Sequence, residues 1–148
     1  MNLLIAADHA GLELKEKIKA RAADLGVSFT DLGTHTIESV DYPDYAASLS
    51  KKLIELGADT HLGILICGSG VGISIAANRF LPIRAVLAES PEVATLAREH
   101  NHANVLCLGS RIVSAEKGVA IVKAFISAKE DQGPRHLNRI KKLGDPRS

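Results

Sequence analysis

Three short stretches of the chain are apolar at every position rather than at alternate positions. They are Leu3–Ala7, Gly63–Cys67 and Val105–Leu108. Strands with apolar side chains on both faces must be covered on both faces, which is typical of parallel sheets in α/β proteins. Helical patterns separate these stretches, so we expect right-handed helical crossovers between successive strands.

Further apolar runs predict two more strands, at 27–32 and 83–88. Gly26 and Gly57 are placed to end two of the intervening helices. The expected helices cover residues 11–25, 43–56, a short segment up to 79, then 91–100, 115–128 and 135–143. We predict one domain, residues 1–148, with a Rossmann-like three-layer α/β/α sandwich, a five-stranded parallel sheet and a C-terminal helix.

Finer expectations concern burial and the chain end. In the helix after Pro43, four apolar side chains share one face and are expected to be buried: Ala46, Leu49, Leu53 and Leu56. Three histidines carry no functional argument and are interpreted as surface residues: His35, His61 and His102. The last residues, Gly144–Ser148, are expected to be frayed.

The chain has 148 residues and a net charge of +1, which does not indicate a broad surface for nucleic acid. No stretch approaches the roughly 20 apolar residues that span a bilayer, and the N-terminus lacks the features of a signal peptide. The two cysteines, Cys67 and Cys107, form neither a disulfide framework nor a metal-ligand spacing. These features predict a cytoplasmic protein.

Ligands of parallel sheets bind beyond the carboxyl ends of the strands. Asp8 and His9 follow the first predicted strand. Cys67 and the loop Gly68–Gly72 end the third, and Arg111 lies just after the fifth. These residues are therefore candidates for one site, although Asp8 also suits a helix N-cap.

Glycines at alternate positions, Gly68, Gly70 and Gly72, open a helix and expose backbone N–H groups to one point. Such a nest binds phosphate or stabilises a developing oxyanion. The loop is not a Walker A motif, and Ile73 stands where a dinucleotide fingerprint needs its last glycine. The alternative is a tight turn that needs small residues. Ser69 either donates its hydroxyl to the anion or shapes that turn.

Cys67 lies at the base of this nest, where the thiolate form of a cysteine is favoured. Free cysteines are more often buried small hydrophobes, and this is our interpretation of Cys107 in the middle of an apolar strand. The position of Cys67 at a strand end favours a chemical role instead.

Four later residues carry two interpretations each. His100 and Asn101 stand at a predicted helix end and suit a C-cap. Arg135 and Arg139 are spaced i, i+4 and share a helix face. That pair is either a solvated charged face or a bidentate clamp for phosphate.

Taken in order, these residues belong to a set of motifs that covers nearly the whole chain. The set comprises Asp8-His9-Ala10-Gly11, Asp41-Tyr42-Pro43, Cys67–Gly72, Ala76-Ala77-Asn78-Arg79, His100-Asn101, Asn104-Val105-Leu106, Gly109-Ser110-Arg111 and Arg135-His136. It resembles the ribose-5-phosphate isomerase B family, which also contains galactose-6-phosphate and allose-6-phosphate isomerases. Each motif is modest alone, whereas the ordered set is specific.

The resemblance implies that the chain interconverts ribose 5-phosphate and ribulose 5-phosphate through a cis-enediolate. It implies Cys67 as the base, Ser69 and the N–H groups of Gly70–Gly72 as the oxyanion site, and His100 with Asp8 for ring opening. The implied substrate contacts are Gly68, Gly70, Val71 and Gly72 in the loop, Tyr42 and Asn101 at the sugar, and His9, Arg111, Arg135 and Arg139 at the phosphate.

Family membership would also imply no metal, no organic cofactor and a homodimer, or a dimer of dimers, that acts on a small sugar phosphate and binds neither nucleic acid nor membrane. Each site would draw His100, Asn101 and Arg111 from the second subunit. Many members carry Thr at the position of Ser69, which keeps the hydroxyl. In another branch a glutamate directly after the loop is the base; Ile73 occupies that position here, which leaves Cys67.

Three other interpretations stay open. The same scaffold would serve an isomerase of six-carbon sugar phosphates. A non-catalytic nucleotide- or phosphate-binding module would need the Gly68–Gly72 loop but not Cys67, His100 and the arginine pair together. An inactive subunit of a hetero-oligomeric isomerase is the third, and the intact Cys67 argues against it.

Overall fold

The structure is a computed structural model, and it describes residues 1–144. Twelve elements follow one another along the chain: β1 (Asn2–Ala7), α1 (Leu12–Lys19), α2 (Ala22–Leu25), β2 (Ser28–Asp31), α3 (Tyr42–Leu56), β3 (Leu62–Cys67), α4 (Val71–Ala77), β4 (Ala85–Leu87), α5 (Pro91–Asn101), β5 (Val105–Gly109), α6 (Ala115–Ser127) and α7 (Pro134–Gly144). Gly144 ends α7, and the rest of the expected frayed end lies outside the described residues.

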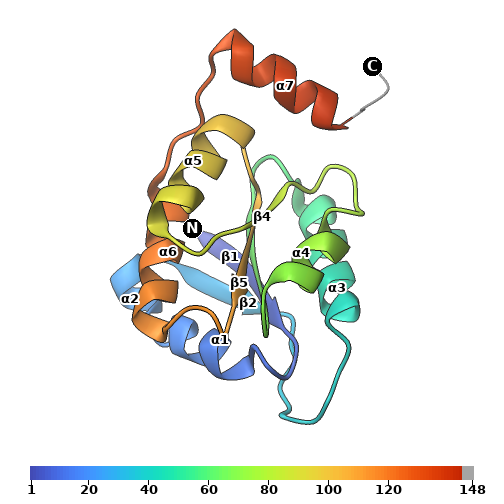
Figure 1. The fold of residues 1–148 in the computed structure, drawn as a ribbon, viewed down its shortest axis with the longest axis vertical. Coiled ribbons are helices and arrows are strands. Elements are labelled where there is room, and N and C mark those ends of the chain that lie inside the picture. The colour runs from blue at the N-terminus through green and yellow to red at the C-terminus, as the bar shows by residue number, and fades with distance from the viewer. Residues whose placement is uncertain (145–148) are drawn as a thin grey trace.

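The five strands form one parallel sheet in the order β2-β1-β3-β5-β4, as predicted (Figure 1). Helices cover both faces and complete the three-layer sandwich. The middle strand, β3, pairs with β1 through Ala7 and Ile66 and with β5 through Cys67 and Gly109. The carboxyl ends of these three strands therefore meet at one edge of the sheet.

Two apolar cores lie on the two faces of the sheet. In β1, Leu3, Ile5 and Ala7 point to the core under α1, α5 and α6. Leu4 and Ala6 point to the other core, under α3 and α4. This two-sided burial is the reason that β1, β3 and β5 are apolar at successive positions. The outer strand β2 instead alternates exposed and half-buried residues.

Three expectations about local structure were wrong. The helix predicted at 11–25 is two helices, because the chain turns at Ala20 and Arg21 between α1 and α2. Leu56 is 40% exposed, since it ends α3 beyond the last turn that reaches the sheet. His102 is only 8% exposed and caps α5 in a left-handed conformation, φ +47°, so it is not a surface residue.

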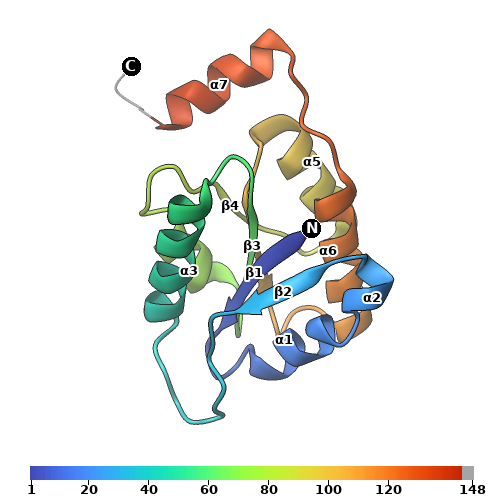
Figure 2. The ribbon, with the colours of Figure 1, turned by 180° about the vertical axis from the view of Figure 1, so that it is seen from behind.

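Helix α7 stands apart from the sandwich and packs against the end of α5 (Figures 1 and 2). The imidazole of His136 stacks on that of His100, with 4.4 Å between ring centroids and an angle of 2° between planes. Leu137 and Leu143 of α7 remain 41% and 56% exposed. No helix within residues 1–144 has the length and apolar character needed to cross a membrane.

Candidate active site

Cys67 is the last residue of β3, and its sulfur faces the loop that follows. The backbone N–H of Gly70 donates to Cys67 Sγ at 3.1 Å. Gly70 has φ +76°, and a Cβ there would lie 2.5 Å from the Leu87 side chain, so only glycine fits this turn. The glycine is therefore required for the geometry that aims a peptide N–H at the thiol.

Ser69 has a defined hydrogen-bonding role in the same loop. The N–H of Val71 donates to Ser69 Oγ at 3.2 Å. Because the oxygen accepts this bond, the hydroxyl proton of Ser69 is available for a further acceptor. The loop N–H groups thus serve partly to orient Cys67 and Ser69, in addition to the oxyanion contacts predicted for Gly70–Gly72.

Asp8 and His9 lie beside Cys67, because β1 and β3 are neighbours. The Asp8 N–H donates to the Ile66 carbonyl at 3.1 Å. One carboxylate oxygen of Asp8 accepts from the Gly11 N–H at 3.0 Å, so the side chain closes the turn before α1. The N-cap residue of α1 is Gly11 rather than Asp8.

His9 is held by the backbone of Val40. The Val40 N–H lies 3.1 Å from His9 Nδ1, and the Val40 carbonyl oxygen lies 3.2 Å from the same nitrogen. A neutral imidazole that accepts from this N–H carries its proton on Nε2, and that nitrogen is then a donor for a ligand.

The side chains of Tyr42 and Arg111 lie against the two ends of the Gly68–Gly72 loop. A Cβ on Gly72 would lie 2.5 Å from the Tyr42 ring, and a Cβ on Gly68 would lie 2.7 Å from Arg111 Nη1. The absence of side chains at these two glycines therefore makes room for a phenol and a guanidinium. Arg111 lies beside this loop within its own chain, because it follows β5, the direct neighbour of β3.

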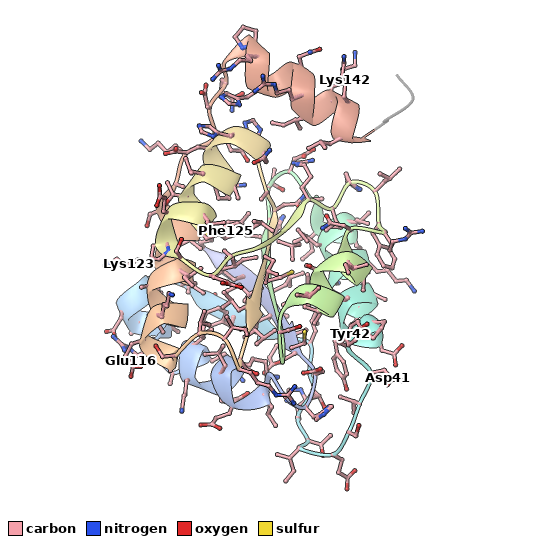
Figure 3. All side chains as sticks on the ribbon, in the orientation of Figure 1. Asp41, Tyr42, Glu116, Lys123, Phe125 and Lys142 are labelled. Carbon is pink, nitrogen blue, oxygen red and sulfur yellow. The ribbon has the colours of Figure 1, made fainter. Side chains whose placement is uncertain are left out.

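His100, Asn101, Arg135 and Arg139 lie at the opposite end of the molecule. Helix α5 starts near the Cys67 edge and runs back to the amino ends of the strands, where Asn104 leads into β5. The stacked His100 and His136 connect this end of α5 to α7. Figure 3 shows Tyr42, at the start of α3, and Lys142 of α7 toward opposite ends of the molecule. Within one chain, the predicted site residues thus form two separate clusters.

Cys107 shares a core with Cys67 but has no access to the site. It is fully buried in the middle of β5, and both cysteines are free. Burial raises the pKa of the Cys107 thiol well above its ordinary value, and the neighbouring Cys67 adds to that rise. The interpretation of Cys107 as a buried small hydrophobe agrees with this environment.

Sequence reasoning missed a buried ion pair behind the site. Lys15 of α1 is fully buried, and its Nζ donates to Asp31 Oδ1 at 2.7 Å and to the Thr34 carbonyl at 2.7 Å. A lysine in a helix is usually solvent-exposed, so its burial was not expected. The sequence feature that could have indicated burial is the position of Lys15 between Leu14 and Ile18, which both face the core.

Comparison with known proteins identifies the family of the chain. The model of the family described as Ribose/Galactose Isomerase matches residues 3–143. The chain belongs to this family. One curated relative is ribose-5-phosphate isomerase B of Escherichia coli (strain K12). It is 44% identical over 141 residues, which cover 95% of this chain and 93% of the relative.

Solved structures of proteins with the same name share the fold. The ribose 5-phosphate isomerase of Thermotoga maritima superimposes with a TM-score of 0.91 at 47% identity, covering 97% of both chains. Ribose-5-phosphate isomerase B of Mycoplasma genitalium, solved with bound ribulose-5-phosphate, gives a TM-score of 0.90 at 42% identity over 97% of this chain and 93% of that one. As a member of the isomerase family, the chain has the Rossmann-like sandwich of these enzymes.

Proposed function

We propose that this chain is an aldose–ketose isomerase that interconverts D-ribose 5-phosphate and D-ribulose 5-phosphate. The observation that carries the proposal is Cys67 at the end of β3, with the Gly70 N–H 3.1 Å from its sulfur. This hydrogen bond orients the sulfur toward the loop, where a general base would meet the substrate. The names of the similar proteins support the choice of substrate.

In the proposed reaction, the Cys67 thiolate removes the proton from C2 of the open-chain aldose. The electron pair moves through the C1–C2 bond onto the C1 oxygen and gives a cis-enediolate. Cys67 then returns the proton to C1, while the hydroxyl proton on O2 is lost and O1 is protonated. Ser69, whose oxygen already accepts from the Val71 N–H, donates to the enediolate; one such donor contributes about 3–4 kcal/mol in comparable sites.

The phosphate of the substrate would lie away from the reacting carbons and align them. His9 supports this role because Val40 holds its Nδ1, and Nε2 would be the nitrogen that contacts the phosphate. Arg111, beside Gly68, offers a charged donor at the same edge. Tyr42, over Gly72, would contact the sugar hydroxyls between the two ends.

A homodimer, or a dimer of dimers, would complete the site. Cys67 stands at the carboxyl end of β3, whereas α5 and α7 hold four other predicted site residues at the amino ends of the strands: His100, Asn101, Arg135 and Arg139. We infer that the second subunit presents them, with His100 assisting ring opening beside Asp8. A free thiol in the role of base also fits a reducing cytoplasm.

Replacement of Cys67 tests the base. Cys67→Ala is expected to lower kcat by at least about a thousandfold, because proton abstraction has no substitute group at that position. The KM for ribose 5-phosphate should change little. The measurement is a coupled assay of ribulose 5-phosphate formation, with and without EDTA. Cys107→Ala is the matched control and should keep its activity; substantial turnover by Cys67→Ala would rule out the proposed base.

The competing functions give different results with the wild-type chain. An isomerase of six-carbon sugar phosphates would show a higher kcat/KM with allose 6-phosphate or galactose 6-phosphate than with ribose 5-phosphate. A nucleotide-binding module would bind NAD or FMN in a spectroscopic titration and would show no isomerisation.

A further inference from the structure

Lys15 is a charged side chain placed where charge is costly. It is 0% exposed, and an ammonium group without water needs hydrogen-bonding partners of its own. Its Nζ has two, Asp31 Oδ1 and the Thr34 carbonyl oxygen, both at 2.7 Å. These partners lie on either side of the point where β2 ends and the loop of residues 32–41 begins. The buried charge therefore acts on the base of this 32–41 loop.

The 32–41 loop is held to the rest of the chain mainly at its two ends. At its start, the Thr34 N–H donates to the Ala7 carbonyl at 2.7 Å, next to the Lys15 bond. At its far end, Val40 contacts His9 Nδ1. Between them, Ile37 is 85% exposed. The start of the loop is thus fixed by backbone bonds to β1 and by the charged hydrogen bond that Lys15 donates to Thr34.

Both ends of the loop are next to proposed substrate groups. Val40 orients His9, and the loop leads directly into Tyr42, which lies over Gly72. Lys15 also stands one helical turn after the β1–α1 turn, since its own N–H donates to the Gly11 carbonyl at 2.9 Å. One side chain therefore connects the segment that carries His9 with the segment that carries Tyr42.

We propose that Lys15 is a positioning residue for substrate binding, which acts through the 32–41 loop on His9 and Tyr42. The inference rests on the proposed function for its kinetic readout. Lys15 does not touch the substrate, because its side chain is fully buried. Its removal would leave the base Cys67 in place and displace the groups that hold the sugar phosphate. The effect should therefore fall on KM rather than on kcat.

The first test is Lys15→Met in the full-length chain, which keeps the length of the side chain and removes its charge. We expect the KM for ribose 5-phosphate to rise by about tenfold or more, because the loop loses a charged hydrogen bond. Lys19→Met is the matched control. Lys19 also binds Asp31, at 2.6 Å to Oδ2, but bonds to Glu16 rather than to Thr34, so its loss should leave KM unchanged.

A second variant separates positioning from stability. Lys15→Met combined with Asp31→Asn removes both charges, so that no buried carboxylate loses its partner. Circular dichroism and urea unfolding measure how much of each variant is folded. A purely structural Lys15 would lower the folded fraction, and hence the apparent kcat, at constant KM. A wild-type KM in the folded double variant would overturn the proposal, and a KM raised as in Lys15→Met would support it.

The same variants still test the role of Lys15 if the wild-type chain shows no isomerase activity. That result would overturn the proposed function alone. The Kd of ribose 5-phosphate, measured by titration calorimetry, then replaces KM as the readout. Binding weakened about tenfold in the double variant supports the role of Lys15, and equal binding by wild type and double variant contradicts it.

Discussion

Position along a strand, rather than burial, distinguishes the two cysteines. Cys67 and Cys107 are 4% and 0% exposed and belong to the same core. Cys107 pairs with Leu65 in mid-strand and is surrounded by side chains that offer no charge. Cys67 pairs with Gly109 at the edge, where the chain leaves the sheet and the Gly70 N–H turns back toward the sulfur. The two cysteines therefore stand two residues apart in the pairing of β3 with β5, and this offset places Cys107 in an apolar environment and Cys67 in a polar one.

Gly72→Ala is expected to damage the proposed site without damaging the fold. The new Cβ would stand 2.5 Å from the Tyr42 ring, and this half-exposed ring would move away from the loop. We expect kcat/KM for ribose 5-phosphate to fall about tenfold or more, with urea unfolding close to that of the wild type. Gly26→Ala is the control, since it has φ +67° and no neighbour within 4 Å. It should lose about 1 kcal/mol of stability and no activity; a Gly72→Ala enzyme with full kcat/KM would contradict the role of Tyr42.

Sequence patterns predicted the location of a residue best where the end of a strand fixes that location. Asp8 follows β1, Cys67 ends β3 and Arg111 comes just after β5, so the order of the sheet places them at the carboxyl ends of three adjacent strands. Lys15 and His102 were missed because the usual surface interpretation of lysine and histidine ignores which partners the fold supplies. Lys15 meets Asp31, and His102 donates from Nε2 to the Asp131 carbonyl at 2.8 Å. Such partners come from segments distant in sequence and no local pattern reveals them.

At the scale of elements, β2 is an edge strand whose end is bound by charged side chains. It lies at the edge of the sheet and alternates exposed with half-buried residues. Its last residue, Asp31, accepts from Lys15 and Lys19 of α1. These ion pairs join the end of β2 to α1. The three inner strands agree closely with the prediction, whereas both edge strands are shorter than predicted: β2 against 27–32 and β4 against 83–88.

Acid should therefore loosen this element first. Burial alone would raise the pKa of Asp31, but hydrogen bonds from Lys15, Lys19 and the Gly33 N–H outweigh it and hold the pKa below its ordinary value of 3.8. The folded carboxylate thus takes up a proton less readily than the unfolded one. Its contribution to stability is present above the ordinary pKa and is lost as the pH falls through the lowered value.

Asp31→Asn checks this expectation. At neutral pH the variant should be less stable by about 3 kcal/mol, because Lys15 is left buried without its counter-charge. Its free energy of unfolding, measured in urea from about pH 6 to about pH 3, should fall less steeply with acid than that of the wild type. Asp24→Asn, at an exposed pair with Arg21, should behave as the wild type. Equal slopes for Asp31→Asn and wild type would contradict the assignment.

At the scale of the whole molecule, the proposed site is divided between its two ends. The carboxyl edge of the sheet holds Cys67 and Tyr42, and the far end holds His100 with the arginines of α7. The helical spacing of Arg135 and Arg139 could be predicted from the sequence. The direction in which α7 leaves the sandwich could not, because it is determined by the stacking of His136 on His100 and by the few contacts of the connecting segment.

Mixed dimers test the shared site. Cys67→Ala and Arg139→Ala damage different halves, and each alone should be nearly inactive under substrate-limited conditions. In a mixed dimer, one site receives both changes and the other receives neither. Co-refolding of equal amounts should therefore restore about a quarter of the wild-type activity, since half of the dimers are mixed and each has one intact site. Activity no greater than the sum of the two parents would show that each chain forms its site alone.

The outward position of α7 has a consequence for how the enzyme responds to its own concentration. If one chain supplies the base and another the phosphate clamp, neither holds a complete site while it is alone. Dilution would then separate the chains and lower the turnover per subunit, while each chain stays folded. The amount of protein in the cell would determine how much of the enzyme exists and also how active each copy is.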